Sequence, residues 1–154
     1  MQSTRNSKLI HAPAEKVFAA YANPEWLEQW QVPDGMKGKV HHFEFRPVGS
    51  YDMSLYYQVK EDATGKTADY EDRFTAKLVD IVPNERITQL IVFDSEDAGF
   101  QGEMILDVLF EPKGGGTLVT FAFDNIPPGI KPEDNEEGTR QSLEKLARFV
   151  EQQP

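Results

Sequence analysis

The side chains that could carry out chemistry are few in this chain of 154 residues. There is no cysteine, which excludes thiol nucleophiles, thiolate metal sites and disulfides. The three histidines are His11, His41 and His42. A metal site needs several ligands that converge, whereas adjacent residues such as His41 and His42 point to opposite faces of a strand. We therefore expect solvated or locally bonded histidines and no metal site.

One carboxylate, Asp72, could act as an acid or a base. If its side chain points inward with Tyr70 and Phe74, it lies among aromatic rings, where acid–base groups are often found. The alternative, which we favour, is that the strand becomes buried only at Phe74 and that Asp72 lies at the rim. The glycines at 114–116 predict a turn between two strands, and no motif of a hydrolase, a zinc protease or a dinucleotide-binding protein is present. The sequence thus leans away from an enzyme and predicts no cofactor.

Aromatic residues form the most conspicuous candidate binding group. Trp26 and Trp30 lie four residues apart on a short predicted helix and share a face, either as a pocket wall or as core at the end of a sheet. Tyr51, Met53 and Tyr57 share one face of a predicted strand, where they could line a cavity or form ordinary core. The residues predicted to line a cavity are Trp26, Trp30, Phe43, Phe45, Tyr51, Met53, Tyr57, Phe74, Phe93, Phe121, Leu143 and Leu146.

The elements that must position these residues follow from the spacing of the apolar side chains. The last helix is the clearest, because Leu143, Leu146 and Val150 recur at steps of three and four residues. Alternating apolar and polar residues, joined by short turns, predict an antiparallel series of strands. The predicted order is a strand at 5–11, helices at 14–22 and 25–30, strands at 39–46, 51–59, 70–82, 86–93, 103–111 and 117–123, and a helix over 139–151.

This order predicts an α+β fold in which a curved antiparallel sheet of six to seven strands surrounds a long C-terminal helix. The sheet must cover its apolar face, and only one long helix is available to do so. A twisted sheet of this size curls, which leaves space beside the helix. Two short helices after the first strand can close one end. We expect the remaining space to be a binding cavity.

Several short segments, in order, resemble a known family. They are residues 10–18 (IHAPAEKVF), 23–30 (NPEWLEQW), 49–51 (GSY), 82–87 (VPNERI), 115–119 (GGTLV) and the helix at 138–146. The chain thereby resembles the helix-grip superfamily, also called SRPBCC, START-like or Bet v 1-like, and in particular proteins similar to the C-terminal domain of the activator of the Hsp90 ATPase.

The resemblance spans nearly the whole chain and implies a single domain over residues 1–154 with a cavity for a hydrophobic ligand. Two positions depart from it. The family often has two glycines where this chain has Val48 and Gly49. It often has a tryptophan early in the last helix, where this chain has Thr139.

The charge of the chain argues against two classes of partner. Sixteen basic residues against 26 acidic ones give a formal net charge of −10. Such a surface repels phosphate backbones and anionic lipids, so we expect no nucleic-acid partner. No apolar run reaches about 18 residues and the first residues lack the apolar segment of a signal peptide, so we expect a cytoplasmic protein without membrane insertion. Oligomeric state stays open, a homodimer included, and no pattern supports a protein partner.

Three functions are compatible with these patterns. The first is binding of a small lipid-like or aromatic molecule in the cavity. The second is an enzyme of the polyketide cyclase, lyase or hydrolase type that uses the same cavity. The third, which the name of the resembling family suggests, is a co-chaperone-like regulator of an Hsp90-type ATPase.

Overall fold

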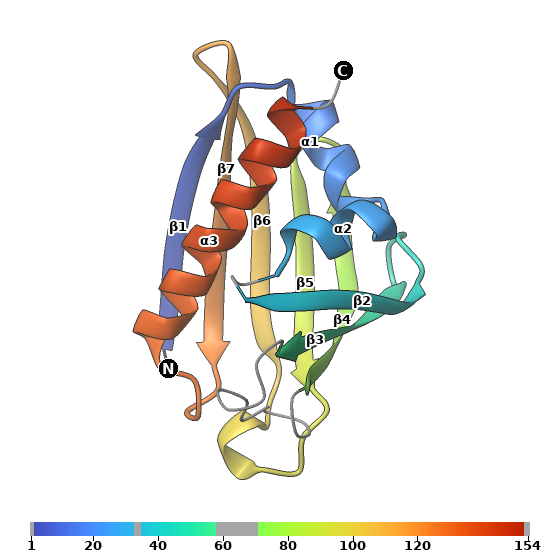
Figure 1. The fold of residues 1–154 in the computed structure, drawn as a ribbon, viewed down its shortest axis with the longest axis vertical. Coiled ribbons are helices and arrows are strands. Elements are labelled where there is room, and N and C mark those ends of the chain that lie inside the picture. The colour runs from blue at the N-terminus through green and yellow to red at the C-terminus, as the bar shows by residue number, and fades with distance from the viewer. Residues whose placement is uncertain (1, 33–34, 58–70, 153–154) are drawn as a thin grey trace.

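The computed structural model describes residues 2–32, 35–57 and 71–152 and confirms the predicted helix-grip fold (Figure 1). Seven strands form one sheet in the order β1-β7-β6-β5-β4-β3-β2, and all neighbouring strands are antiparallel. The elements are β1 (Gln2–Ile10), α1 (Ala14–Tyr21), α2 (Pro24–Trp30), β2 (Met36–Phe43), β3 (Ser50–Tyr57), β4 (Glu71–Val82), β5 (Arg86–Phe93), the 3-10 helix η2 (Ala98–Phe100), β6 (Met104–Lys113), β7 (Gly116–Ile126) and α3 (Pro132–Glu151).

The two short helices are separated by a local capping signal. The side-chain oxygen of Asn23 accepts hydrogen bonds from the backbone N–H groups of Glu25 and Trp26, and Pro24 occupies the first helical position. Both features stabilise a helix N-terminus. The predicted break between α1 and α2 is confirmed, and α2 begins one residue earlier than predicted.

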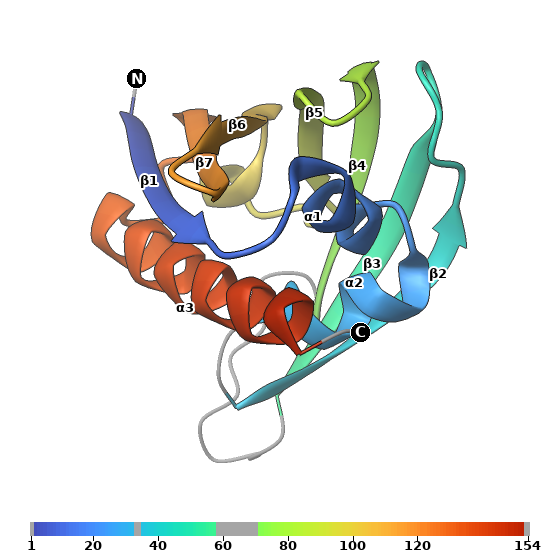
Figure 2. The ribbon, with the colours of Figure 1, turned by 90° about the horizontal axis from the view of Figure 1, so that it is seen from above.

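The long helix α3 lies across the concave side of the sheet, as the end-on view shows (Figure 2). It packs on β1 and β7 and against α1 and α2. Its C-terminal half buries Leu143, Leu146 and Val150. The helix therefore covers the β1 side of the concave face, and α1 and α2 cover one end of it.

A β-bulge in β2 overturns the prediction that His41 and His42 point to opposite faces. The register shifts between Val40, which pairs with Met53, and His42, which pairs with Asp52. The extra residue breaks the alternation of side chains. Nε2 of His41 lies 2.8 Å from Oγ of Ser54, which shares the convex face with Asp52, so both histidines lie on that face.

The turn before β3 carries local backbone strain. Val48 is 88% exposed and has φ +67°, a conformation that is an outlier for a β-branched residue. Its neighbour Gly49 is required by space, because a Cβ there would collide with the carbonyl oxygens of Glu44 and Arg46.

Candidate functional site

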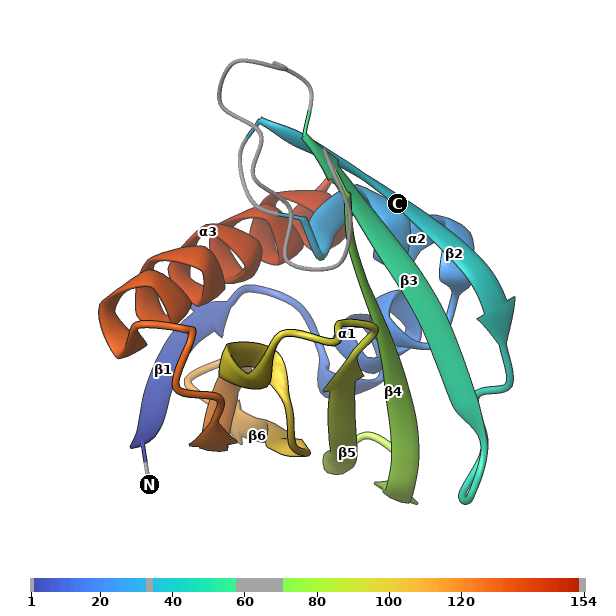
Figure 3. The same ribbon diagram turned by 90° about the horizontal axis from the view of Figure 1, so that it is seen from below.

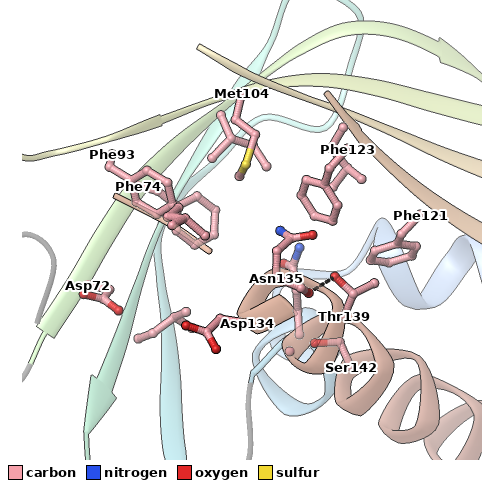
Figure 4. A pocket seen from close by; sticks show the side chains of 16 residues that line it. Asp72, Phe74, Phe93, Met104, Phe121, Phe123, Asp134, Asn135, Thr139 and Ser142 are labelled. Atoms are coloured by element: carbon pink, nitrogen blue, oxygen red, sulfur yellow. Dashed lines mark hydrogen bonds between the residues drawn. The ribbon is translucent and has the colours of Figure 1, made fainter. Parts of the chain in front are cut away.

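A pocket of about 230 Å³ lies between the N-terminal half of α3 and the inner face of β4 to β7, at the end of the sheet seen in Figure 3. Figure 4 shows its aromatic strand residues facing polar residues of α3. Among the described residues, its apolar lining comprises Leu55, Phe74, Ile91, Phe93, Met104, Leu106, Phe121, Phe123 and Ile130. The remaining lining residues are Gln31, Asp72, Asp134, Asn135, Gly138, Thr139 and Ser142.

The pocket exists because α3 presents small residues to the sheet along its first half. Gly138, Thr139 and Ser142 face the strands there, whereas Leu143 and Leu146 fill the space farther along the helix. An added Cβ on Gly138 would meet no atom within 4 Å. The hydroxyl of Thr139 is held by its own helix, since it donates to the carbonyl oxygen of Asn135 at 2.7 Å (Figure 4). Small side chains therefore leave room that bulky ones would occupy.

The other end of the concave face is filled by aromatic packing. Trp30 is fully buried, and its indole N–H donates to the Ala20 carbonyl at 3.0 Å. Its ring lies 5.3 Å from Tyr21 and 6.3 Å from Phe121, centroid to centroid. Phe121 thus belongs to both ends, because one side of it packs on Trp30 and the other borders the pocket. Such tilted and edge-on contacts are the favoured geometries for aromatic pairs.

A buried polar network connects this packed end to the pocket. The amide of Gln89 donates to the hydroxyl of Tyr21 at 2.5 Å, and the hydroxyl of Tyr51 donates to Gln89 Oε1 at 3.2 Å. The amide of Gln31, which also lines the pocket, lies 3.3 Å from the Tyr21 hydroxyl and 3.4 Å from that of Tyr51. Buried polar groups are normally paired in this way. Gln31 is therefore the point at which the network reaches the pocket.

Both tyrosine hydroxyls of the network are held in their neutral form. Burial raises the pKa of Tyr21 above its ordinary value, although hydrogen bonds with Gln89, Tyr51 and Gln31 lower it in part. Burial raises the pKa of Tyr51 further, and the adjacent Tyr21 adds to the effect. At neutral pH these hydroxyls can donate and accept hydrogen bonds, but they do not supply a charge.

The structure separates the predicted lining residues into two groups. Phe74, Phe93 and Phe121 border the pocket. Most of the others lie in the packed core or at its edge, outside the pocket lining. This second group comprises Trp26, which packs on Phe149, together with Trp30, Phe43, Phe45, Tyr51, Met53, Leu143 and Leu146. The side chain of Tyr57 lies outside the described residues. A role in ligand binding stays a prediction for every residue of the predicted set.

The expectation that Asp72 lies at an exposed rim is wrong. Its side chain is only 1% exposed and borders the pocket. The alternation of buried residues in β4 starts at Asp72 and continues through Phe74, so the strand is covered two residues earlier than predicted. Leu55 of β3 pairs with Asp72 and also borders the pocket. Strand parity could have indicated the inward direction, but the depth of burial depends on neighbouring elements.

The charged side chains among the described lining residues are both acidic. Asp72 is buried on β4, and Asp134 is exposed in the first turn of α3, so the two carboxylates come from opposite walls (Figure 4). Within this part of the lining there is no lysine, arginine or histidine. The pocket is therefore apolar at the sheet and acidic at two points of its wall.

Two sequence signals for this site were missed. Gln89 has the same strand parity as Ile87 and Ile91, so an uncharged polar residue on an apolar face indicated a buried hydrogen-bond network. Thr139 and Ser142 share the helix face of Leu143, so small residues on this face indicated a gap under the helix.

Comparison with known proteins identifies the family. The sequence model for activator of Hsp90 ATPase homolog 1-like proteins matches residues 11–151. The chain belongs to this family. A comparison with curated proteins gave no match.

Solved structures of similar proteins agree with this assignment. The chain is similar to a protein from Chromobacterium violaceum, with 30% sequence identity, 98% of each chain covered and a TM-score of 0.86. It shares its fold with a protein from Arthrobacter aurescens (19% identity, 98% of this chain and 87% of that chain covered, TM-score 0.80). It also shares its fold with the AHSA1-like protein from Aeromonas hydrophila (19% identity, 97% and 92% covered, TM-score 0.73).

None of the helices in the described part of the chain is both long and apolar enough to cross a membrane. The same residues contain no group of three or more acidic or histidine side chains arranged to hold a metal ion.

Proposed function

We propose that this protein binds a small, largely apolar molecule in the pocket between α3 and β4 to β7. The observation that carries the proposal is a pocket of about 230 Å³ whose strand wall is made of Phe74, Phe93, Phe121 and Phe123 with aliphatic neighbours. Pockets that combine an apolar wall with a few polar groups are the usual sites for small ligands. This volume is below the usual range for sites of drug-sized ligands, so a compact compound suits it better than a long lipid.

The polar residues of the pocket would orient this ligand. Gln31 brings a network of neutral hydroxyl and amide groups to the wall, while Asn135 and Thr139 lie on the opposing helix. The Asn135 side chain is itself held, because its Oδ1 accepts a hydrogen bond from Thr4 at 2.5 Å. Polar groups held by such second contacts give a site its specificity at little entropic cost.

A variant that fills the pocket tests the proposal. The change Thr139→Trp places a large ring in the position where the resembling family often has one. The matched control, Glu136→Trp, adds the same ring on an exposed position of α3. A thermal-shift screen with small aromatic and aliphatic compounds, backed by native mass spectrometry, would measure binding. A ligand at 100 times its Kd stabilises a protein by about 2.7 kcal/mol.

We expect wild type and Glu136→Trp to respond to the same compounds and Thr139→Trp to lose the response. The smaller change Ser142→Leu narrows the same pocket in case the tryptophan disturbs folding. The proposal is contradicted by a screen without any shift or bound mass, or by pocket-filled variants that bind as wild type does.

An enzymatic role in the same pocket is a second candidate, and the burial of Asp72 favours it. A buried carboxylate that borders a pocket is a common acid or base in enzymes. Incubation with polyketide-like aromatic substrates, followed by mass spectrometry of the products, tests this role. Turnover that Asp72→Asn abolishes without loss of binding would support it, and turnover that survives the substitution would exclude Asp72 as the acid or base.

The remaining predictions on partners and location rest on charge and family. A net charge of −10 supports a protein that binds neither nucleic acid nor anionic membranes, and a cytoplasmic location stays a prediction. A co-chaperone-like role is suggested by the family description alone. Retention of an Hsp90-type chaperone in a pull-down, with a changed ATPase rate, is the measurement that would establish it.

A further inference from the structure

We infer that the ligand of the pocket carries a cationic head, such as a protonated amine, on a compact aromatic or aliphatic body. This inference rests on the proposed function and specifies its ligand class. It follows from the sign and position of the charges in the pocket wall, where the described charged side chains are Asp72 and Asp134.

Asp72 is placed to accept hydrogen bonds from such a head. Its side chain is 1% exposed and borders the pocket from β4. A carboxylate has about four acceptor sites, so Asp72 can bind a ligand ammonium in addition to its contacts within the protein. Hydrogen bonds between an ammonium and a carboxylate are roughly twice as strong as those between neutral groups.

The neighbouring aromatic residues favour the same charge. Asp72 and Phe74 lie two residues apart on the inner face of β4, and the Phe74 ring packs edge-on against Phe93, with centroids 6.4 Å apart. An ammonium bonded to Asp72 would lie on the same side of the sheet as these rings, and the faces of aromatic rings attract cations. The hydrophobic body of the ligand extends from there along Phe93, Phe121 and Phe123.

Asp134 supplies a second negative charge near the entrance. It is exposed in the first turn of α3, across the pocket from β4 (Figure 4). Together with the net charge of −10, it attracts cations to the pocket and repels carboxylates. Fatty acids and aromatic acids are thereby disfavoured, although the apolar wall would accept their hydrocarbon parts.

Three probes of one hydrocarbon body test the inference. 3-Phenylpropylamine, 3-phenylpropanol and 3-phenylpropionate differ in the head group and are close in size to the pocket. Isothermal titration calorimetry at neutral pH gives the three affinities for wild type, Asp72→Asn and Asp124→Asn. The last variant is a matched control, because it makes the same change of charge at an exposed position of β7 outside the pocket lining.

We expect wild type and Asp124→Asn to bind the amine at least about tenfold more tightly than the alcohol, and the acid least tightly. Asp72→Asn should lose most of this preference and keep its affinity for the alcohol. Asp134→Asn should reduce the preference less and make it less sensitive to salt, because exposed charges are screened. If Asp72→Asn does not fold, the order of the three affinities on wild type and the effect of Asp134→Asn still test whether the pocket prefers a cationic head.

The failure of this inference differs from that of the proposed function. Binding of the alcohol without preference for the amine, or a preference that Asp72→Asn leaves unchanged, overturns the cationic head and leaves the pocket as a binding site. Absence of binding by all three probes counts against the pocket itself and overturns both.

Discussion

The two ends of the concave face share an aromatic composition but differ in how completely they are filled. At one end, Trp30 is fully buried between Tyr21 and Phe121, and its single polar atom is hydrogen-bonded. At the other end, Phe74 and Phe123 face a pocket of about 230 Å³. The first end has two short helices above it, whereas among the described residues the second is covered mainly by the small residues of the first half of α3. What covers an aromatic wall therefore decides whether it becomes core or the wall of a pocket.

This difference has an energetic basis. A void removes the contact partners of the side chains that line it, so these side chains contribute less to stability than enclosed ones. The packed end can thus supply stability while the open end gives some up in exchange for room. Substitutions that remove an aromatic ring at each end test the difference.

The largest expected effect is that of Trp30→Ala at the packed end. Removal of a large enclosed aromatic side chain costs about 3–5 kcal/mol. We expect Phe123→Ala in the pocket wall to cost about half as much or less, because the ring already borders empty space. Chemical denaturation with urea measures both. Equal costs would show that the two ends are packed alike.

A smaller effect is expected from Tyr51→Phe, which removes one hydroxyl from the network between the ends. Gln89 Oε1 then loses the donor now at 3.2 Å. A buried group left without its partner costs about 1–3 kcal/mol. Tyr56→Phe on the convex face is the control and should change the free energy of unfolding by no more than about 0.5 kcal/mol. If both variants have the same free energy of unfolding, the network does not stabilise the fold.

Alkaline pH should weaken the same hydrogen-bond network of Tyr21, Tyr51 and Gln89. The pKa of Tyr21 and that of Tyr51 are raised by burial above the ordinary value of about 10. Above about pH 10 the unfolded chain loses these protons while the folded protein keeps them. The stability of the fold is therefore fully present below about pH 10 and decreases as the pH rises from the unfolded-state pKa toward the raised folded-state pKa.

Absorbance at 295 nm measures this behaviour. Tyr21 and Tyr51 should ionise above the ordinary pKa and together with unfolding. Ionisation of these two hydroxyls near the ordinary pKa, with the fold intact, would show that the network is open to solvent.

The smallest effect is expected outside both ends, at the strained turn. Val48→Gly should stabilise the fold by about 0.5–1 kcal/mol, because glycine adopts φ +67° without the cost that a β-branched residue pays. The control is Val79→Gly on β4, which is 50% exposed and should destabilise by a similar amount. Midpoints of chemical denaturation should rise for Val48→Gly and fall for Val79→Gly. A destabilised Val48→Gly would mean that the turn carries no strain.

The fold was largely predictable from local patterns. The alternation of apolar residues predicted the strands, and the spacing of Leu143, Leu146 and Val150 predicted α3. Asn23 and Pro24 marked the boundary between the short helices. These features act within a few residues of each other, so the sequence alone is sufficient to indicate them.

The position of the pocket could not be predicted from local patterns, because it depends on contacts between distant segments. Strand parity placed Tyr51 and Phe74 on inward faces alike, but only the packing of distant elements makes Tyr51 core and Phe74 pocket wall. The bulge that turns His41 to the convex face arises from the register of β2 against β3. Asp72 is buried because of what surrounds β4, not because of its neighbours in sequence.

The amino-acid sequence by itself determined the class of fold, the order of its elements and the face on which each apolar residue lies, because these depend on backbone geometry repeated every two or 3.6 residues. Only the tertiary structure decided where the concave face stays empty and which carboxylate borders the space. Empty volume is what remains after all the covering side chains have been placed, and no single segment carries that information.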